Sequence, residues 1–301
     1  MDGITQCWKI AVNELDIAPN EGVCMSVLNA AARLGVPDLA TDVFRVLKLS
    51  GVAWKEYHFA ALIEAFCRDN KLKQALITLY IMRSNGIPPL PGTLVIICDS
   101  IKDIESLDSA IAIIDDIHIT KVGLDIDALR TIIQASVLLR DLQRAVGVYK
   151  SYPDYGWRPD LALFNILLDG CIDAKHRQLG DELLADMKKL KIKANEETYE
   201  RIIKLCLTQE VYEDAFFYLE EMKAAGFVPP RTVYVALVEK CHAENDTRKD
   251  IALAEMRECG YERPNFQRVK APEVTSQSTG MGLDFDALEY IKTGGMSGKP
   301  S

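Results

Sequence analysis

Residues 197–230 read ETYERIIKLCLTQEVYEDAFFYLEEMKAAGFVPP, and this stretch decides the fold. One apolar face with the i, i+3, i+4, i+7 spacing of a helix is formed by Tyr199, Ile202, Ile203 and Cys206. A second face of the same kind is formed by Ala215, Leu219 and Met222. Gly226 and the two prolines after it end the second helix. The stretch therefore predicts a helix–turn–helix hairpin.

The pattern of this hairpin recurs with a period of 35 residues through most of the chain. An aromatic or large apolar residue stands at Phe59, Leu94, Leu129, Phe164, Tyr199 and Tyr234. A small residue in the second helix stands at Ala75, Ala110, Ala145, Gly180 and Ala215. Such a period indicates stacked units, because one hairpin cannot bury its apolar face without neighbours. We therefore expect an all-α solenoid, in which a bulky residue at the small position would hold two helices apart.

Three segments resemble a known family: FNILLDGC at 164–171, YLEEMKAAG at 218–226 and RPD at 158–160. They are similar to pentatricopeptide repeats. The resemblance implies a right-handed α-solenoid and a mitochondrial protein of the fungal type, with plastid or cytoplasm as the alternatives. Seven repeats are expected at residues 22–55, 56–90, 91–125, 126–160, 161–195, 196–230 and 231–265.

The two ends of the chain fall outside these repeats. Residues 1–21 are interpreted as an N-terminal cap or as part of an eighth repeat whose second helix starts at Trp8, and we expect a truncated N-terminus. Residues 266–301 are rich in Ser, Thr, Gln and Gly at their start and predict a flexible tail. A short helix is expected at 283–291, either as a cap on the last repeat or as a peptide that docks a protein partner.

The composition argues for binding rather than catalysis. We find no catalytic motif, no histidines or cysteines at metal-ligand spacing, and no phosphate-binding loop, so we expect no enzyme activity, no metal and no cofactor. Cys171, Cys206 and Cys241 are one repeat apart and are expected to be buried thiols on first helices. No apolar run is long enough to span a bilayer, so no membrane insertion is expected.

The resemblance to the family implies that single-stranded RNA binds along the concave face, with bases read one per repeat. The two reading positions are the residue after the first-helix aromatic and the residue that closes the repeat. They give the candidate pairs Ser26 with Lys55, Arg130 with Asp160, and Asn165 with Asn195. The last pair would favour a pyrimidine, with cytosine expected. The other four repeats supply Ala60/Leu90, Val95/Asp125, Glu200/Pro230 and Val235/Asn265.

Charge leaves two function classes open. The chain has 44 acidic and 35 basic side chains, a formal net charge of −9, whereas RNA affinity needs cations at phosphates. Lys188 and Lys189 belong to a basic cluster in the fifth repeat and are candidates for phosphate contacts. One hypothesis is an organelle factor for RNA processing, stability or translation. The other is a protein–protein scaffold with little RNA contact, docking partners through its acidic surface or its tail.

Overall fold

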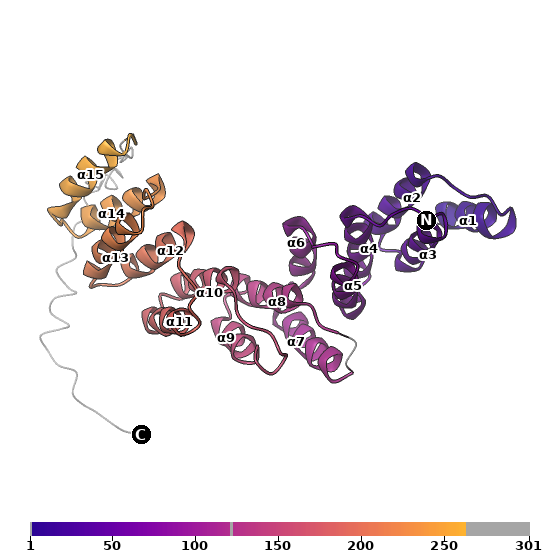
Figure 1. The fold of residues 1–301 in the computed structure, drawn as a ribbon, viewed down its shortest axis with the longest axis horizontal. Helices are drawn as coiled ribbons and strands as arrows, with labels where there is room; N and C mark the ends of the chain where they lie inside the picture. Colours follow the sequence, from indigo (N-terminus) through magenta and orange to yellow (C-terminus); the bar gives the residue numbers. More distant parts are fainter. Residues whose placement is uncertain (1, 121–122, 263–301) are drawn as a thin grey trace, which may run out of the picture. The chain divides into compact units, whose positions relative to one another are not determined.

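The computed structural model describes residues 2–120 and 123–262 of the 301-residue chain (Figure 1). The expected tail at 266–301 and its helix at 283–291 lie outside these residues. The described part is all-helical, with fifteen α-helices and one π-helical segment. The expected solenoid of stacked helical units is confirmed.

The first helices of the repeats begin at one register, close to each 35-residue step. They are α2 (Glu21–Leu34), α4 (Glu56–Arg68), α6 (Pro91–Ser100), α8 (Ile126–Leu138), α10 (Leu161–Asp173), α12 (Glu196–Leu207) and α14 (Arg231–Ala243). Each of these packs against the next first helix along the chain. They form one continuous layer, and we call its solvent-facing side the first-helix face.

The second helices form the other layer. They are α3 (Pro37–Leu49), α5 (Leu72–Ser84), α7 (Ile104–Ile119), α9 (Leu142–Lys150), α11 (Arg177–Lys189), α13 (Glu213–Ala224) and α15 (Arg248–Glu258). In Figure 1, α7, α9 and α11 lie in a row beside α8 and α10. Several helices of this layer, such as α3, α5, α13 and α15, end close to a glycine in the left-handed region, for example Gly226 at φ 87°, where a glycine adopts the backbone without a Cβ clash.

The third repeat departs from the expected hairpin. Its second helix α7 makes its close contacts with α5 and α8 rather than with its own first helix α6. Helix α6 begins in register at Pro91 but is only ten residues long, because it ends early, where the chain turns to an extended residue at Ile101. As a result α5 also contacts α8, two repeats further along the chain.

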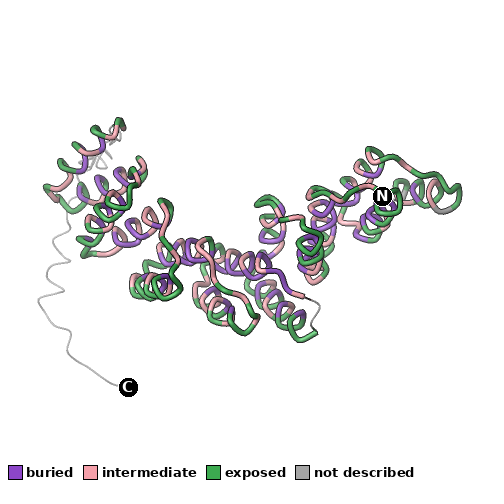
Figure 2. The backbone as a smooth tube through the Cα atoms, in the orientation of Figure 1, coloured by how far each residue is buried: buried purple, intermediate pink, exposed green. Residues whose placement is uncertain are grey.

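The core lies between the two layers, as the purple stretches of Figure 2 show. Phe59, Leu129, Phe164 and Tyr234 are at most 1% exposed, so four of the six register residues are fully buried. Cys171, Cys206 and Cys241 are fully buried free thiols on first helices. The sequence-based expectation for these cysteines is therefore confirmed.

The small position of the second helix has a different neighbour from the one expected. A Cβ added to Gly180 would lie 2.3 Å from Leu205 Cδ2, and Leu205 belongs to the first helix of the following repeat. Ala75, Ala110, Ala145 and Ala215 are likewise fully buried. In the fifth repeat the small residue therefore permits close stacking of one repeat on the next, and not only closure of its own hairpin.

The N-terminal segment is helical from Asp2, earlier than Trp8. Helix α1 (Asp2–Lys9) continues into a π-helical turn at Ile10–Glu14. The Trp8 ring is 5% exposed, and its Nε1 donates a 2.8 Å hydrogen bond to Asp42 Oδ2 on α3. This contact fixes the segment to the first repeat.

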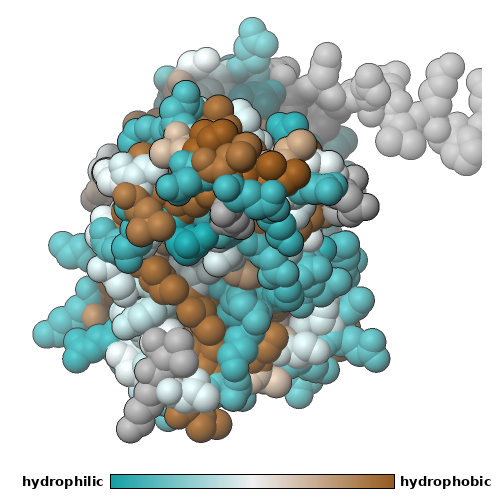
Figure 3. All heavy atoms as spheres, turned by 90° about the vertical axis from the view of Figure 1, so that its right-hand side faces the viewer, coloured by the Kyte–Doolittle hydropathy of each residue, from teal (hydrophilic) through white to brown (hydrophobic). Residues whose placement is uncertain are grey.

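Figure 3 views the molecule from the right-hand side of Figure 1, and there brown apolar patches lie separated by teal side chains.

Candidate nucleic-acid interface

Both candidate reading positions have a defined place in the fold. The residue after the register aromatic lies in the second turn of a first helix. The residue that closes a repeat is the N-cap of the next first helix, as Asp160 is for α10 and Asn195 is for α12. Aspartate and asparagine are favoured at N-caps because their side-chain oxygens accept backbone N–H groups. The closing residue therefore has a structural role in each of these repeats.

The structure brings Asn165 and Asn195 together around Thr198. Thr198 Oγ1 lies 2.8 Å from Asn165 Oδ1 and 2.7 Å from Asn195 Oδ1. Asn195 Oδ1 also accepts the backbone N–H of Thr198 at 2.9 Å. Asn165 is only 6% exposed, because it lies on the side of α10 that packs against α12. The pair is therefore part of an inter-repeat hydrogen-bond network and offers little surface.

Arg130 and Asp160 also lie close together, but the two side chains form an ion pair with each other. The Arg130 guanidinium forms ion pairs with Asp160 and with Asp127, and its side chain is 21% exposed. Arg83 at the end of α5 forms ion pairs with Asp127 and with Asp125, the N-cap of α8. Five charged side chains from three repeats thus form one network. In this conformation Arg130 and Asp160 are therefore engaged in ion pairs within the protein.

Burial controls the ionisation of this network. Asp125 is 1% exposed, and burial raises its pKa above the ordinary aspartate value, although the Asp127 N–H and Arg83 act in the opposite direction. The Tyr152 hydroxyl and Arg130 Nε are buried without a hydrogen-bond partner among the described residues. Burial likewise raises the Tyr152 pKa.

Ser26 and Lys55 are exposed, in contrast to the other two pairs. Ser26 Oγ donates to the carbonyl oxygen of Gly22 in its own helix at 2.9 Å. Lys55 Nζ lies 3.6 Å from Glu21 Oε1 and 5.5 Å from the centre of the Tyr57 ring. The residues are accessible at the start of α2 and α4, and the lysine charge is partly balanced by Glu21.

Lys188 and Lys189 lie in the last turn of α11, in the layer of second helices. Both are exposed, and Lys189 Nζ forms an ion pair with Asp186 Oδ1 at 2.9 Å. Because the two helices of a hairpin are antiparallel, these lysines lie at the same end of the fifth repeat as Asn165. They belong to the other layer, however.

A second basic feature was not recognised from the sequence alone. Arg33, Arg68 and Lys102 follow one another at intervals of 35 and 34 residues, at or just beyond the ends of α2, α4 and α6. Together with Glu64 and Asp99 they line a groove of about 570 Å³. Arg68 is paired with Glu64, whereas Arg33 and Lys102 form no ion pair within residues 2–120 and 123–262. The repeat spacing of these cations was the signal that could have found them.

The first helices as a whole are not basic. They carry eleven acidic and seven basic side chains, namely Glu21, Glu56, Glu64, Asp99, Asp127, Asp169, Asp173, Glu196, Glu197, Glu200 and Glu239 against Arg33, Arg68, Arg130, Arg201, Lys204, Arg231 and Lys240. Six of the acids lie in α10, α12 and α14. Four of the bases lie there too, whereas α2, α4 and α6 carry four acids and two bases, so the formal charge is −2 in both groups of helices. The first three repeats differ in that exposed cations gather at one end of their helices.

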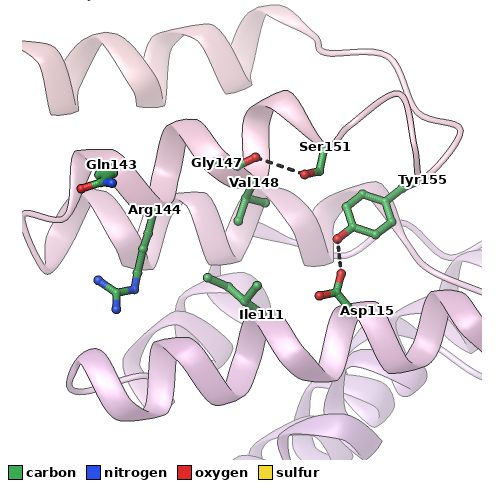
Figure 4. A pocket seen from close by; sticks show the side chains of 8 residues that line it. All are labelled: Ile111, Asp115, Gln143, Arg144, Gly147, Val148, Ser151 and Tyr155. Carbon is green, nitrogen blue, oxygen red and sulfur yellow. Dashed lines mark hydrogen bonds between the residues drawn. The ribbon is translucent and has the colours of Figure 1, made fainter.

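Another cavity of about 570 Å³ lies between α7 and α9 and contains none of the predicted residues (Figure 4). Tyr155 donates its hydroxyl to Asp115 Oδ1 at 2.6 Å, and Ser151 Oγ bonds the carbonyl of Gly147 at 3.2 Å. Arg144 is held by Asp108 and Asp141. Both charged groups on its wall thus have partners, Asp115 in a tyrosine hydroxyl and Arg144 in two aspartates that do not line the cavity.

Among the residues that the structure describes, no group of three or more His, Cys, Asp or Glu side chains is arranged to hold a metal ion. None of the described helices combines the length and the apolar character needed to cross a bilayer.

Comparison with known proteins identifies the family. A model described as "Pentatricopeptide repeat-containing protein" matches residues 21–152, and a "Pentatricopeptide repeat domain" model matches residues 148–209 and 182–244. The chain belongs to the pentatricopeptide repeat family. The matches extend over the hairpins from α2 to α14, the same helices whose register is seen in the sequence.

Two curated relatives are mitochondrial proteins. The "Mitochondrial 15S rRNA processing factor ppr3" of Schizosaccharomyces japonicus is 28% identical over 129 residues, covering 42% of this chain and 19% of that protein. The "Pentatricopeptide repeat-containing protein 1, mitochondrial" of Mus musculus is 28% identical over 159 residues, covering 52% of this chain and 22% of that protein. The matched part thus spans about a fifth of the length of each of these relatives.

Solved structures of the family are also similar to this repeat protein. The maize pentatricopeptide repeat protein PPR10 matches with a TM-score of 0.41 at 15% identity, covering 86% of this chain and 41% of that one. The same maize protein in complex with an 18-nucleotide psaJ RNA element matches with a TM-score of 0.40, at 15% identity and over 84% of this chain and 42% of that one.

Proposed function

We propose that this pentatricopeptide repeat protein is a mitochondrial RNA-binding factor that holds single-stranded RNA along its first-helix face. In this proposal the protein contributes to RNA processing, stability or translation by binding and not by catalysis. Family membership supports the class of ligand, and the two mitochondrial relatives support the compartment.

One observation carries the proposal, namely the row of Arg33, Arg68 and Lys102 along a single groove. A single strand needs cations at regular intervals, because each phosphate carries one charge. Three exposed cations at one register of three adjacent repeats meet that need. In the second repeat, Arg68 lies eight residues beyond the reading position Ala60, or about 12 Å along an α-helix. One bound strand can therefore place its bases near the starts of the first helices and its phosphates near their ends.

The bases would meet a mixed set of side chains. Ser26 and Lys55 are exposed, while Arg130, Asp160 and Asn165 are engaged with protein partners. Readout is therefore expected to be weaker than one base per repeat, and phosphate contacts are expected to supply most of the affinity.

The test compares two sets of cations in a binding assay with a random single-stranded RNA pool. The triple variant Arg33→Gln, Arg68→Gln, Lys102→Gln is expected to weaken binding of all sequences alike. Loss of three phosphate contacts should also lower the slope of log K against log salt by about two. The double variant Lys188→Gln, Lys189→Gln removes exposed cations from the other layer, and is expected to have the smaller effect.

The alternative function, a scaffold that docks protein partners, is an outcome of the same assay. The net acidic charge of α10, α12 and α14, six acids against four bases, favours it, because excess carboxylates would repel an RNA backbone. Absence of RNA retention at low salt by the folded wild-type protein would refute the RNA proposal and support the scaffold. A larger loss in the Lys188/Lys189 variant than in the triple variant would refute the assignment of the groove.

A further inference from the structure

We propose that an aromatic cavity at the ends of α5 and α7 binds one unpaired nucleobase of the RNA strand. The inference rests on the proposed binding of single-stranded RNA, and it adds a site that contains none of the reading positions. The cavity has a volume of about 350 Å³, and its aromatic lining consists of Tyr80, His118, Tyr155 and Trp157. A volume of this order and an aromatic lining are typical of sites for small ligands.

The packing of the third repeat brings these four rings together. Because α7 packs against α5 and α8, Tyr80 near the end of α5 lies on the same cavity as His118 in the last turn of α7. Tyr155 and Trp157 come from the connection between α9 and α10. The rings of His118 and Tyr155 are nearly perpendicular with centroids 5.1 Å apart, and the Tyr155 hydroxyl is held by Asp115 (Figure 4). The wall is therefore formed without a ligand.

Gly123 allows the backbone to lie close to one of these rings. Its φ is 103°, in the left-handed region, and a Cβ added to it would lie 2.3 Å from Tyr80 Cζ. A larger residue at this position would therefore displace the tyrosine ring. Tyr80 is nevertheless 37% exposed, so part of its surface stays accessible at the cavity. The glycine thus fixes the place of a ring that a flat ligand can reach.

The polar atoms of the rings favour a nucleobase over a cation. Within residues 2–120 and 123–262, the Tyr80 hydroxyl, the His118 nitrogens and Trp157 Nε1 have no hydrogen-bond partner. A nucleobase offers a flat face for stacking, and ring nitrogens or carbonyl oxygens as acceptors at its edge. A methylated ammonium also packs against aromatic faces, but it has no acceptor for the indole N–H, which can only donate. A base is therefore the ligand that matches both the faces and the donors.

The cavity lies at the end of the repeats where the proposed strand places its bases. Leu124 on its wall directly precedes the N-cap of α8, and Trp157 lies three residues before Asp160, the N-cap of α10. In the fourth repeat the reading residue Arg130 is held in an ion pair with Asp160. A base that reaches this repeat therefore meets no free reading pair, and it can turn into the neighbouring cavity and stack there.

The experiment combines removal of a base with removal of a ring. An RNA is first selected with the wild-type protein from a random single-stranded pool, and each nucleotide in turn is replaced by an abasic one. Removal of the base that enters the cavity is expected to weaken binding about tenfold, the scale of one base–aromatic stack. Trp157→Leu and Tyr80→Leu should cause a similar loss with the intact RNA and almost no further loss with that abasic RNA. Tyr80→Phe should keep this coupling, because the ring remains.

Trp54 supplies the matched control. It lies half-buried in the connection between α3 and α4, and its ring packs against the rings of Phe44 and Phe59. Trp54→Leu therefore makes the same change in another connection between repeats, away from the cavity. The tenfold effect of the abasic position should persist in this variant.

The possible results separate the base site from the proposed function. Thermal melting by circular dichroism shows whether Trp157→Leu is folded, and the more exposed Tyr80 supplies the test if it is not. Absence of an abasic position coupled to Trp157 or Tyr80, or equal coupling to Trp54, would overturn the base site. Quenching of Trp157 fluorescence by AMP or by a trimethyl-lysine peptide, without a coupled position in the RNA, would overturn it in favour of a free nucleotide or a methylated protein. Failure of the wild-type protein to retain any RNA would instead overturn the proposed function, and the assignment of a strand base with it.

Discussion

Replacing Arg83 by methionine is expected to destabilise the protein in a strongly pH-dependent way. Arg83 is the cation that bridges Asp125 and Asp127 from a helix two repeats away. Methionine keeps most of the aliphatic stem and removes the charge. Asp127 still has Arg130, so Asp125 is the carboxylate that loses its cation while it is 1% exposed.

Two considerations limit the loss of stability expected for Arg83→Met. Removing one partner of a buried ion pair costs about 3–5 kcal/mol, and the value here falls at the lower end because the Arg83 side chain is 41% exposed. Asp125 can also avoid the penalty by taking up a proton. From an ordinary aspartate pKa, that protonation costs about 5 kcal/mol at pH 7.5 and about 2 kcal/mol at pH 5.5. We expect a loss of about 3 kcal/mol at pH 7.5 and of no more than about 2 kcal/mol at pH 5.5.

The sign follows from the direction of the pKa shift. The pKa of Asp125 is already raised in the folded protein, chiefly by burial, and loss of Arg83 raises it further. The folded state then holds its proton more tightly than the unfolded state. The contribution of this carboxyl to stability therefore falls as the pH rises from the ordinary aspartate range through the folded pKa. The deficit of the variant should grow from pH 5.5 to pH 7.5.

Urea unfolding followed by circular dichroism at the two pH values measures the effect. Lys73→Met is the matched control, because Lys73 is on the same helix and pairs with Asp116 at an exposed site. An exposed pair contributes at most about 1 kcal/mol. A loss in Arg83→Met no larger than that of Lys73→Met, or one that does not change with pH, would refute the argument.

Three other outcomes are expected. Ala215→Leu should lower stability by about 1–3 kcal/mol, because Ala215 is fully buried at a close helix contact, and an unchanged melting temperature would show that the site has room. Cys171 and Cys206 should react slowly with a thiol reagent at pH 8 in native protein, because burial raises the pKa of each thiol to about 12. The exposed Cys7 should react at once, and equal rates for the three cysteines would contradict the burial of Cys171 and Cys206. Trp8→Phe should cost about 1 kcal/mol through loss of the bond to Asp42, measured by thermal melting, and Cys7→Ser nearby should be neutral.

The repeated part of the fold could be predicted from the sequence because it depends on short-range patterns. Apolar spacing fixes which face of a helix is buried, and the register of Phe59, Phe164 and Tyr234 gave helices that start within a few residues of their expected positions. The third repeat could not be predicted in this way. The partners of α7 are chosen by packing among α5, α6 and α8, and no periodic pattern encodes that choice.

The candidate site was harder to predict from the sequence, because the residues at the reading positions have partners that only the structure reveals. The sequence predicts that Asn165 and Asn195 act together, and the structure does bring them together. Their shared partner Thr198 lies three positions beyond the cap, where nothing in the sequence marks it. Arg130 and Asp160 are likewise adjacent, but each satisfies the charge of the other. A pair of polar residues at reading positions is therefore compatible with both readout and internal bonding.

The same distinction applies to charge, which decides where RNA can bind. A net charge of −9 describes the whole surface, whereas a bound strand meets only one layer of helices. In that layer the cations that are free of ion pairs matter more than the total, since a paired arginine such as Arg68 must leave Glu64 before it can meet a phosphate. Among the described residues Arg33 and Lys102 have no ion pair, whereas Lys189 has one and its unpaired neighbour Lys188 belongs to the other layer. Exposed cations at repeat spacing, most of them unpaired, are thus a sharper criterion for a backbone-binding groove in such a solenoid than a local count of lysines.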